Sequence, residues 1–388
     1  ACFGEMCGWE RANWFASKGM EVRYEYSYSR QNWFEASAEE HQASREKVAL
    51  FDMSSFAKFV VQGRDAEKAL NRICANDVAV ENGKVVYTSW LNERGGIESD
   101  LTVTRLREDV FLVITAGASQ NRDLAWLYKN IPEVDHVTVT DVTSGYAVLS
   151  LMGPESRNLL SKITPADLSN EVFPFGTGRE IEVGYAKALA LRMTYVGELG
   201  WEIYTPTEFA QDIYDKILEA GVDHGLKLAG MHALNSLRLE KAFRHWGHDI
   251  TDEDTPLEAG LGFAVKFDKP GGFMGQDALL RQKDQISAAK NGVLEKRLVQ
   301  FALRDPGPLL YHNEPIWCNG KIVGDLTSGM YGHTIGTCLG MGYVTNEDGV
   351  SKDFLESSTF EIEVAGERYQ ASASLKAFYD PKSERVRM

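Results

Sequence analysis

A carboxylate beside a glycine turn is the first feature of this sequence that could carry out chemistry. Gly95 and Gly96 predict a tight turn, and Asp100 follows it at the start of the β-branched run 101–104, which predicts a strand. An acid at such a junction often only stabilises the turn. Asp100 on its own is therefore a weak candidate for a functional group.

A second segment strengthens the case. Residues 192–204 alternate polar and apolar side chains around two glycines and two acids, and they contain Tyr195 and Glu202. Together with Asp100 and Tyr87 they supply two carboxylates and two flat rings with polar tips. Two such segments are far more specific than either one alone.

These four side chains suit a ring with a 2-amino-4-oxo edge, such as a pterin. The paired N–H donors of that edge need a carboxylate acceptor, and the ring faces need apolar or aromatic groups to stack on. Asp100 and Glu202 could provide the first, and Tyr87 and Tyr195 the second. Acids that cap turns and tyrosines that fill a core would be the alternative if only one such segment were present.

The elements that must position these residues predict an α+β fold, because short strands alternate with helices. Helices are predicted over 64–75, 154–163 and 208–220, and a strand over 111–115. Thr207 is expected to cap the helix over 208–220, and Gly221 to end it.

Changes in composition divide the chain into three regions. Residues 1–40 are crowded with aromatic side chains interleaved with polar ones, so we expect this segment to dock on another surface. An α+β region follows over 41–285, and the polar stretch 281–296 predicts a domain boundary. Short strands separated by glycine turns then predict a small antiparallel barrel over 286–388.

Charge and composition exclude several function classes. The chain has 388 residues, a net charge of -15 and 44% hydrophobic residues, which is ordinary for a globular protein but opposes binding to nucleic acid or to an anionic membrane. Its five cysteines show no zinc spacing and predict a reducing compartment. No apolar run is long enough to cross a bilayer. We therefore expect the cytoplasm of a bacterium or the mitochondrial matrix.

Two cofactor classes are not expected in this chain. A strand, a G-x-G-x-x-G turn and a helix do not occur in that order, so no Rossmann-type FAD or NAD site is predicted. His232, His245 and His248 are close in sequence but lack ligand spacing, and no metal site is assigned.

Several segments resemble the folate-binding aminomethyltransferase family, which includes the glycine cleavage T protein. They are residues 51–56, 92–103, 152–157, 195–202 and 256–261, so the resemblance covers nearly the whole chain. Residues 4–15, 167–175 and 236–241, with His245 and Trp246, are more narrowly similar to the C-terminal half of sarcosine and dimethylglycine dehydrogenases. In those proteins a flavin domain precedes this half.

The resemblance implies a three-lobed fold, with two lobes in 41–285 and tetrahydrofolate bound at the centre. Asp100 would then face the N5/N10 region of the folate, and Glu202 would hold the pterin edge. Tyr195 and Tyr87 would line the pterin.

One departure from the family concerns an arginine. Where the T protein has Ala-Arg-Asp, this chain has Ala233-Leu234-Asn235, which favours the dehydrogenase branch over transfer from a lipoyl protein. Arg238 could compensate as a cofactor-binding residue. Alternatively, it forms an ion pair with Glu240 or another neighbour on its helix.

The resemblance also implies a reaction and its partners. The carbon from oxidative demethylation of a small N-methyl amine, delivered as an iminium, would be captured as 5,10-methylenetetrahydrofolate, and a flavoprotein domain or subunit would supply the oxidation. Asp100 would act as general base and stabilise positive charge. Two alternatives are a stand-alone tetrahydrofolate-dependent methyltransferase or demethylase, and a non-catalytic regulatory subunit like that of pyruvate dehydrogenase phosphatase.

Overall fold

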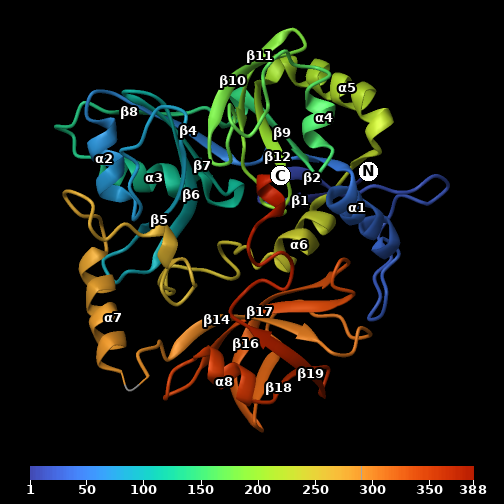
Figure 1. Cartoon of the computed structure of the whole chain (residues 1–388), viewed down its shortest axis with the longest axis vertical. Coiled ribbons are helices and arrows are strands. Elements are labelled where there is room, and N and C mark those ends of the chain that lie inside the picture. Colours follow the sequence, from blue (N-terminus) through green and yellow to red (C-terminus); the bar gives the residue numbers. More distant parts are fainter. Residues whose placement is uncertain (290) are drawn as a thin grey trace.

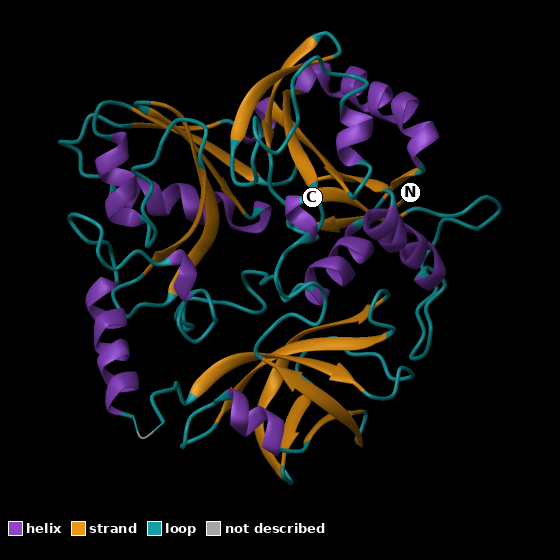
Figure 2. Ribbon diagram, viewed as in Figure 1, coloured by secondary structure: helices purple, strands orange, loops and turns teal. Residues whose placement is uncertain are grey.

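Three lobes surround a common centre in the structure, which is a computed structural model describing residues 1–289 and 291–388 (Figure 1). Two lobes are built on β-sheets that carry helices, and the third is a barrel of strands (Figure 2). The predicted α+β class, the three lobes and the C-terminal antiparallel barrel are thus confirmed. No helix within the described ranges combines the length and the apolar character that crossing a bilayer requires.

The first lobe holds Asp100 on a five-stranded antiparallel sheet. Its strands are β4 (Ala57–Gln62), β5 (Val85–Leu91), β6 (Ile97–Arg107), β7 (Val110–Thr115) and β8 (Thr138–Asp141), in the order β5-β6-β7-β4-β8. Helices α2 (Ala66–Ile73) and α3 (Gln120–Asn130) belong to the same lobe. Leu101 and Val103 of β6 pack in one core with Leu70 of α2. Because side chains alternate along a strand, Asp100 faces the opposite side of the sheet, toward the centre.

The second lobe holds Glu202 on a six-stranded sheet. Its strands are β3 (Val48–Asp52), β9 (Tyr146–Met152), β10 (Gly178–Val183), β11 (Ala186–Leu191), β12 (Gly200–Pro206) and β13 (Leu226–Leu228), in the order β10-β11-β12-β9-β3-β13. Helices α4 (Ser156–Leu160) and α5 (Ala210–Gly221) cover one face, where Trp201 and Ile203 pack against Ile213. By the same alternation, Glu202 faces the other side.

The inner faces of the two sheets meet in one shared core. Leu112 and Ile114 of the first sheet pack there with Val148 and Leu191 of the second. Leu237 of α6 (Met231–Glu240) belongs to the same cluster. Asp100 and Glu202 are therefore carried by two different sheets that face a common interior.

The N-terminal segment begins with a hairpin rather than with irregular chain. Strands β1 (Cys2–Met6) and β2 (Trp9–Trp14) pair in antiparallel fashion, and α1 (Phe34–Glu46) follows. Trp14 is fully buried, and the ring of Trp33 stacks on His232 of α6 with centroids 5.2 Å apart. Part of the aromatic content thus anchors this segment to the rest of the chain.

The third lobe is a closed barrel. Its strands are β14 (Lys296–Leu303), β15 (Pro315–Cys318), β16 (Lys321–Gly332), β17 (Thr337–Thr345), β18 (Phe360–Val364) and β19 (Glu367–Ser374), joined in the order β14-β17-β16-β15-β18-β19, with α8 (Lys352–Ser357) beside them. Helix α7 (Gln276–Ala288) runs between the first lobe and the barrel (Figure 1).

Some local expectations differ from the structure. Residues 281–288 of the polar stretch belong to α7 and not to a linker, while Lys290 lies outside the described residues. Thr207 opens a short 3-10 turn without capping through its side chain, and α5 begins at Ala210. Helix α5 ends at Gly221, as predicted, and a 3-10 turn over residues 222–224 follows it before Gly225, where φ is +65°. Glycine tolerates this left-handed backbone without strain.

Candidate functional site

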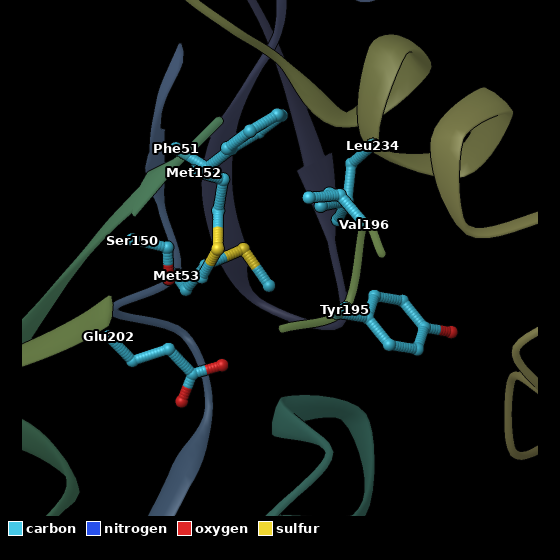
Figure 3. A pocket seen from close by; sticks show the side chains of 8 residues that line it. All are labelled: Phe51, Met53, Ser150, Met152, Tyr195, Val196, Glu202 and Leu234. Atoms are coloured by element: carbon cyan, nitrogen blue, oxygen red, sulfur yellow. The ribbon is translucent and has the colours of Figure 1, made fainter. Parts of the chain in front are cut away.

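A cavity of about 200 Å³ lies at the inner face of the second lobe (Figure 3). We call it the Glu202 cavity. The lining side chains come from β3, β9, β12, α6 and the loops that follow β3 and β11: Phe51, Met53, Ser150, Met152, Tyr195, Val196, Glu202 and Leu234. Most are apolar, with a carboxylate and two hydroxyls among them, which is the usual make-up of a small-molecule site.

Glu202 brings a carboxylate into these apolar surroundings. Tyr204, two residues further along β12, donates its hydroxyl to Glu202 Oε2 at 2.8 Å. Burial raises the pKa of Glu202, and the Tyr204 hydrogen bond partly opposes that shift. Among the described residues no lysine or arginine pairs with it, and Oε1 receives no hydrogen bond. This oxygen is free to accept from a ligand.

Ser150 is a site residue that the sequence did not reveal. It lies directly opposite Glu202 in the pairing of β9 with β12, so the two side chains share one face of the sheet. Its hydroxyl is buried and has no hydrogen-bond partner among the described residues. A buried hydroxyl without a partner is costly, so a ligand group beside Glu202 would relieve that cost.

Tyr195 forms another wall of the cavity from the loop between β11 and β12. Its hydroxyl donates to the Arg244 carbonyl at 2.8 Å, and its ring stacks on Phe243 with centroids 6.1 Å apart. Burial raises the pKa of Tyr195. The hydroxyl therefore stays protonated and the ring is held in place.

Asp100 and Tyr87 form a second group next to Tyr195. Tyr87 on β5 donates its hydroxyl to Asp100 Oδ2 on β6 at 3.1 Å, and its ring stacks on Phe263. Burial raises the pKa of Asp100 to about 6, although the hydrogen bond from Tyr87 acts to lower it. Asp100 is close enough to Tyr195 to raise the pKa of that hydroxyl as well. Tyr195 thus joins the Asp100 group to the Glu202 cavity.

The predicted glycine turn before Asp100 has a steric basis. Gly95 has a φ of +86°, and a side chain on Gly96 would collide with the Asp252 carbonyl oxygen. The turn therefore packs tightly under the chain near residue 252. Strand β6 begins at Ile97, so Asp100 lies within the strand and not at its first position.

Arg238 does not line the cavity. Its buried guanidinium donates to Asp249 at 2.6 Å, to Asn235 at 2.7 Å and to Ser328 of the barrel at 2.9 Å. The expected ion pair with Glu240 is not formed, since residues two apart point to different sides of a helix. Glu240 pairs instead with Arg45. We infer that Arg238 positions α6, Asp249 and the barrel.

Leu234 lies at the position where the resemblance noted in the sequence would imply an arginine. Its side chain is one of the apolar walls of the Glu202 cavity. The departure from the implied pattern therefore lies at the wall of this cavity, where this chain has an aliphatic side chain. The resulting set of one free carboxylate oxygen, the Ser150 hydroxyl and apolar walls suits a flat heterocycle with N–H donors on one edge.

Comparisons with known proteins show the family and the fold of the chain. Residues 1–269 match the GCVT N-terminal domain family, and residues 296–380 match the glycine cleavage T-protein C-terminal barrel domain. The crystal structure of the glycine cleavage system aminomethyltransferase T from Bartonella henselae superposes with a TM-score of 0.80 at 25% identity, covering 98% of this chain and 94% of that one.

Two curated relatives are oxidising enzymes. The 4-methylaminobutanoate oxidase (formaldehyde-forming) of Paenarthrobacter nicotinovorans is 47% identical over 100% of this chain and 45% of its own length. Human mitochondrial sarcosine dehydrogenase is 35% identical over 99% of this chain and 45% of its own. The chain thus spans less than half the length of these relatives. The resemblance seen in the sequence is confirmed.

Proposed function

We propose, from the premise that this chain belongs to the glycine cleavage T-protein family of folate-dependent aminomethyltransferases, that it transfers a one-carbon unit from an N-methyl amine to tetrahydrofolate. In this reaction the amine is oxidised elsewhere, and the carbon leaves the chain as 5,10-methylenetetrahydrofolate. The proposal requires a folate site, a base and a source of the oxidised amine, and each is supported by different residues.

The Glu202 carboxylate is the observation that carries the folate site. It is buried among apolar side chains, its pKa is raised by burial, and within the described chain no basic group compensates its charge. A buried carboxylate is unfavourable unless donors surround it. The 2-amino and N3–H groups of a pterin would supply two such donors in the plane of the carboxylate.

The remaining residues of the cavity fit the same ring. The Ser150 hydroxyl, which has no partner in the described chain, would bond a polar atom at the ring edge next to Glu202. Met53, Met152 and Leu234 would cover the ring faces together with Tyr195. In this proposal the bicyclic ring lies beside Glu202, and the rest of the folate lies in the interior between the lobes.

Asp100 is the proposed catalytic residue. Bound tetrahydrofolate supplies the nucleophilic N5 and the second nitrogen, N10, that close a ring around the transferred carbon. With a pKa of about 6, the carboxylate is largely ionised near neutral pH and still a useful base. It can accept the proton released on ring closure and stabilise positive charge nearby, while the Tyr87 hydroxyl fixes its orientation.

The N-methyl amine and the flavoprotein follow from the relatives. The two oxidising enzymes named above act, by their names, on 4-methylaminobutanoate and on sarcosine, and this chain corresponds to less than half of each. We infer that a flavoprotein domain or subunit docks on the aromatic N-terminal segment 1–40. There Phe3, Tyr26 and Tyr28 are exposed.

Calorimetric titration of the purified chain with tetrahydrofolate tests the folate site. We expect micromolar binding that Glu202→Gln weakens at least about tenfold, because the amide would present N–H donors to the N–H donors of the pterin. Glu180→Gln, at an exposed ion pair with Lys187, is the matched control and should bind like the parent. A folded chain that binds no tetrahydrofolate would refute the proposal and favour a regulatory subunit.

A further inference from the structure

A second cavity, of about 510 Å³, lies beside the Glu202 cavity. We call it the Arg11 cavity. It is lined by Trp9, Glu10, Arg11, Ala12 and Phe15 of the N-terminal segment, by Asp52 at the end of β3 with Ser54 and Ser55 after it, and by Ala229 and Met231 at the start of α6. Asp52 and Ser54 face this cavity, whereas Met53 between them faces the Glu202 cavity. The two cavities thus share a wall.

Arg11 is an uncompensated cation in this cavity. It makes no hydrogen bond or ion pair with any residue in the described part of the chain, and its Nε is buried without a partner. Burial lowers the pKa of Arg11. Two buried arginines of the same region, by contrast, are paired with carboxylates: Arg45 with Glu198 and Glu240, and Arg238 with Asp249. A partly buried guanidinium without partners is unfavourable, so an anionic ligand would stabilise it.

Carboxylates and aromatic rings complete the lining. Asp52 is held by the Ser54 backbone N–H at 2.9 Å and does not pair with Arg11, so the two opposite charges stay apart across the cavity. Glu10 adds further negative charge, while Trp9 and Phe15 offer aromatic faces. Alkylammonium groups bind well to such faces because of the cation–π attraction.

We propose that the Arg11 cavity binds a small zwitterionic N-methylated amino acid. Its carboxylate pairs with Arg11, and its methylammonium group lies toward Asp52 and the rings of Trp9 and Phe15. A simple anion would be repelled by Asp52 and Glu10, and a simple amine by Arg11, so the lining selects a ligand that carries both charges. The choice of an N-methylated amine rests on the proposed function, but binding at this site does not require folate.

Ligand-observed NMR and calorimetry on the folded chain without folate test this site. The probes are N-methylglycine and 4-(methylamino)butanoate, with butanoate and methylammonium as single-charge controls. We expect at least one zwitterion to bind with a Kd of about 1 mM or below, and to bind at least ten times more tightly than both controls. Arg11→Gln should weaken it at least tenfold. Arg64→Gln, at an exposed arginine, should not.

Two further measurements separate this site from the folate site. Arg11→Gln should change tetrahydrofolate affinity less than twofold, and Glu202→Gln should leave amino-acid binding unchanged. Asp52→Asn should reduce the affinity of the zwitterion to that of butanoate, and it tests the site even if Arg11→Gln does not fold. The proposal is overturned if neither zwitterion binds, if butanoate binds as tightly as the zwitterion, or if folded Arg11 and Asp52 variants bind like the parent.

Discussion

At the scale of single residues, the surroundings of Asp100 make its carboxylate a stronger base than that of an exposed aspartate. Burial, with a smaller contribution from the nearby acids Asp123 and Asp249, raises its pKa from 3.8 to about 6, and the Tyr87 hydrogen bond opposes this shift. A base is most effective when its pKa lies near the working pH. The same burial makes the ionised form unfavourable for the folded state.

We expect one-carbon transfer to rise with pH through about 6, as Asp100 becomes ionised. Asp100→Asn should remove this step and most of the transfer, and still bind tetrahydrofolate within several-fold of the parent. Pre-steady-state rates across pH 5–8 would check this, with the exposed Asp109→Asn as the control. A fully active Asp100→Asn enzyme would contradict the assignment.

The fold itself should become more stable when Asp100 is neutralised. Because its folded-state pKa is raised, stability falls as pH rises from about 4 to about 6 and stays lower above that. The free energy of unfolding of Asp100→Asn should therefore be about 1 to 3 kcal/mol higher than that of the parent at pH 7.5. This difference should shrink toward pH 4. Urea unfolding at both pH values measures it, and an equal effect at both would argue against a raised pKa.

Ser150→Ala should weaken tetrahydrofolate binding about five- to tenfold. The substitution removes a hydroxyl opposite Glu202 but disturbs no hydrogen bond of the described chain, so stability should be unchanged or slightly higher. Ser37→Ala removes another buried hydroxyl without a partner, in α1 and outside the lining of the Glu202 cavity, and is the matched control. Calorimetry that shows no difference between the two variants would exclude Ser150 from the site.

At the scale of elements, a buried ion cluster holds α1, α6 and the Tyr195 loop together. Arg45 of α1 donates to Glu198 at 3.1 Å and to Glu240 of α6 at 2.9 Å. It also donates to the Val196 carbonyl at 2.6 Å, one residue after Tyr195. The wall of the Glu202 cavity is therefore fixed by a cation in a helix far away in sequence.

Arg45→Met should destabilise the fold by about 3 to 5 kcal/mol, because buried Glu240 loses its arginine and buried Glu198 keeps only Arg385. Lys187→Met, at an exposed ion pair, should cost less than about 1 kcal/mol. Burial alone would raise the pKa of Glu240, but His41 and Arg45 lower it to about 2. The stability that comes from ionised Glu240 is therefore present above pH 4.5 and lost toward pH 2. Urea unfolding measured against pH should show that the free energy of unfolding of Arg45→Met falls less on acidification than that of the parent.

Sequence patterns predicted the helices and strands better than they predicted contacts between distant side chains. The apolar periodicity gave α2 and α5 within a few residues, and the glycine-separated runs gave the barrel, because local burial patterns determine both. Strand β15 was missed because it has four residues and starts with proline. Arg238 donates to Asp249 in a loop and to Ser328 in the barrel. Both partners are distant in sequence, so no local pattern indicates these contacts.

The residues of the candidate site could be predicted only in part, because some of them are marked by local sequence patterns and others are not. Asp100 and Glu202 stood out as acids among glycines, and the structure faces both toward the common interior. Ser150 gave no signal, since a hydroxyl inside an apolar strand is indistinguishable in sequence from a core serine. Its importance follows from register with Glu202, which depends on the pairing of distant strands.

At the scale of the whole molecule, the lobes are joined by shared hydrophobic clusters. The two sheets and α6 pack in one cluster, and Leu239 of α6 packs with Leu298 and Met341 of the barrel. Polar contacts reinforce that junction, since Thr327 of the barrel donates to Asp249 at 2.7 Å. Each lobe also has a core of its own, and these shared clusters join the three lobes to one another.

We therefore expect a single calorimetric unfolding transition for the whole chain. A fragment of residues 1–289 should melt at a clearly lower Tm and bind tetrahydrofolate at least tenfold more weakly, because α6 loses the barrel side chains that pack against it. Differential scanning calorimetry of both proteins checks this. Two separate transitions, or a fragment as stable as the whole chain, would show that the barrel is an independent unit.

The pairing of β3 with β9 and β13 has a consequence for synthesis on the ribosome. The five-stranded sheet is complete once residue 141 has emerged, but β3 must wait for β9 at 146–152 and for β13 at 226–228. At 5–20 residues per second, β3 spends about 5 to 20 s with an unpaired apolar edge before β9 arrives. Translation slowed within residues 53–145 should therefore increase aggregation of the nascent chain more than the same delay placed after residue 240.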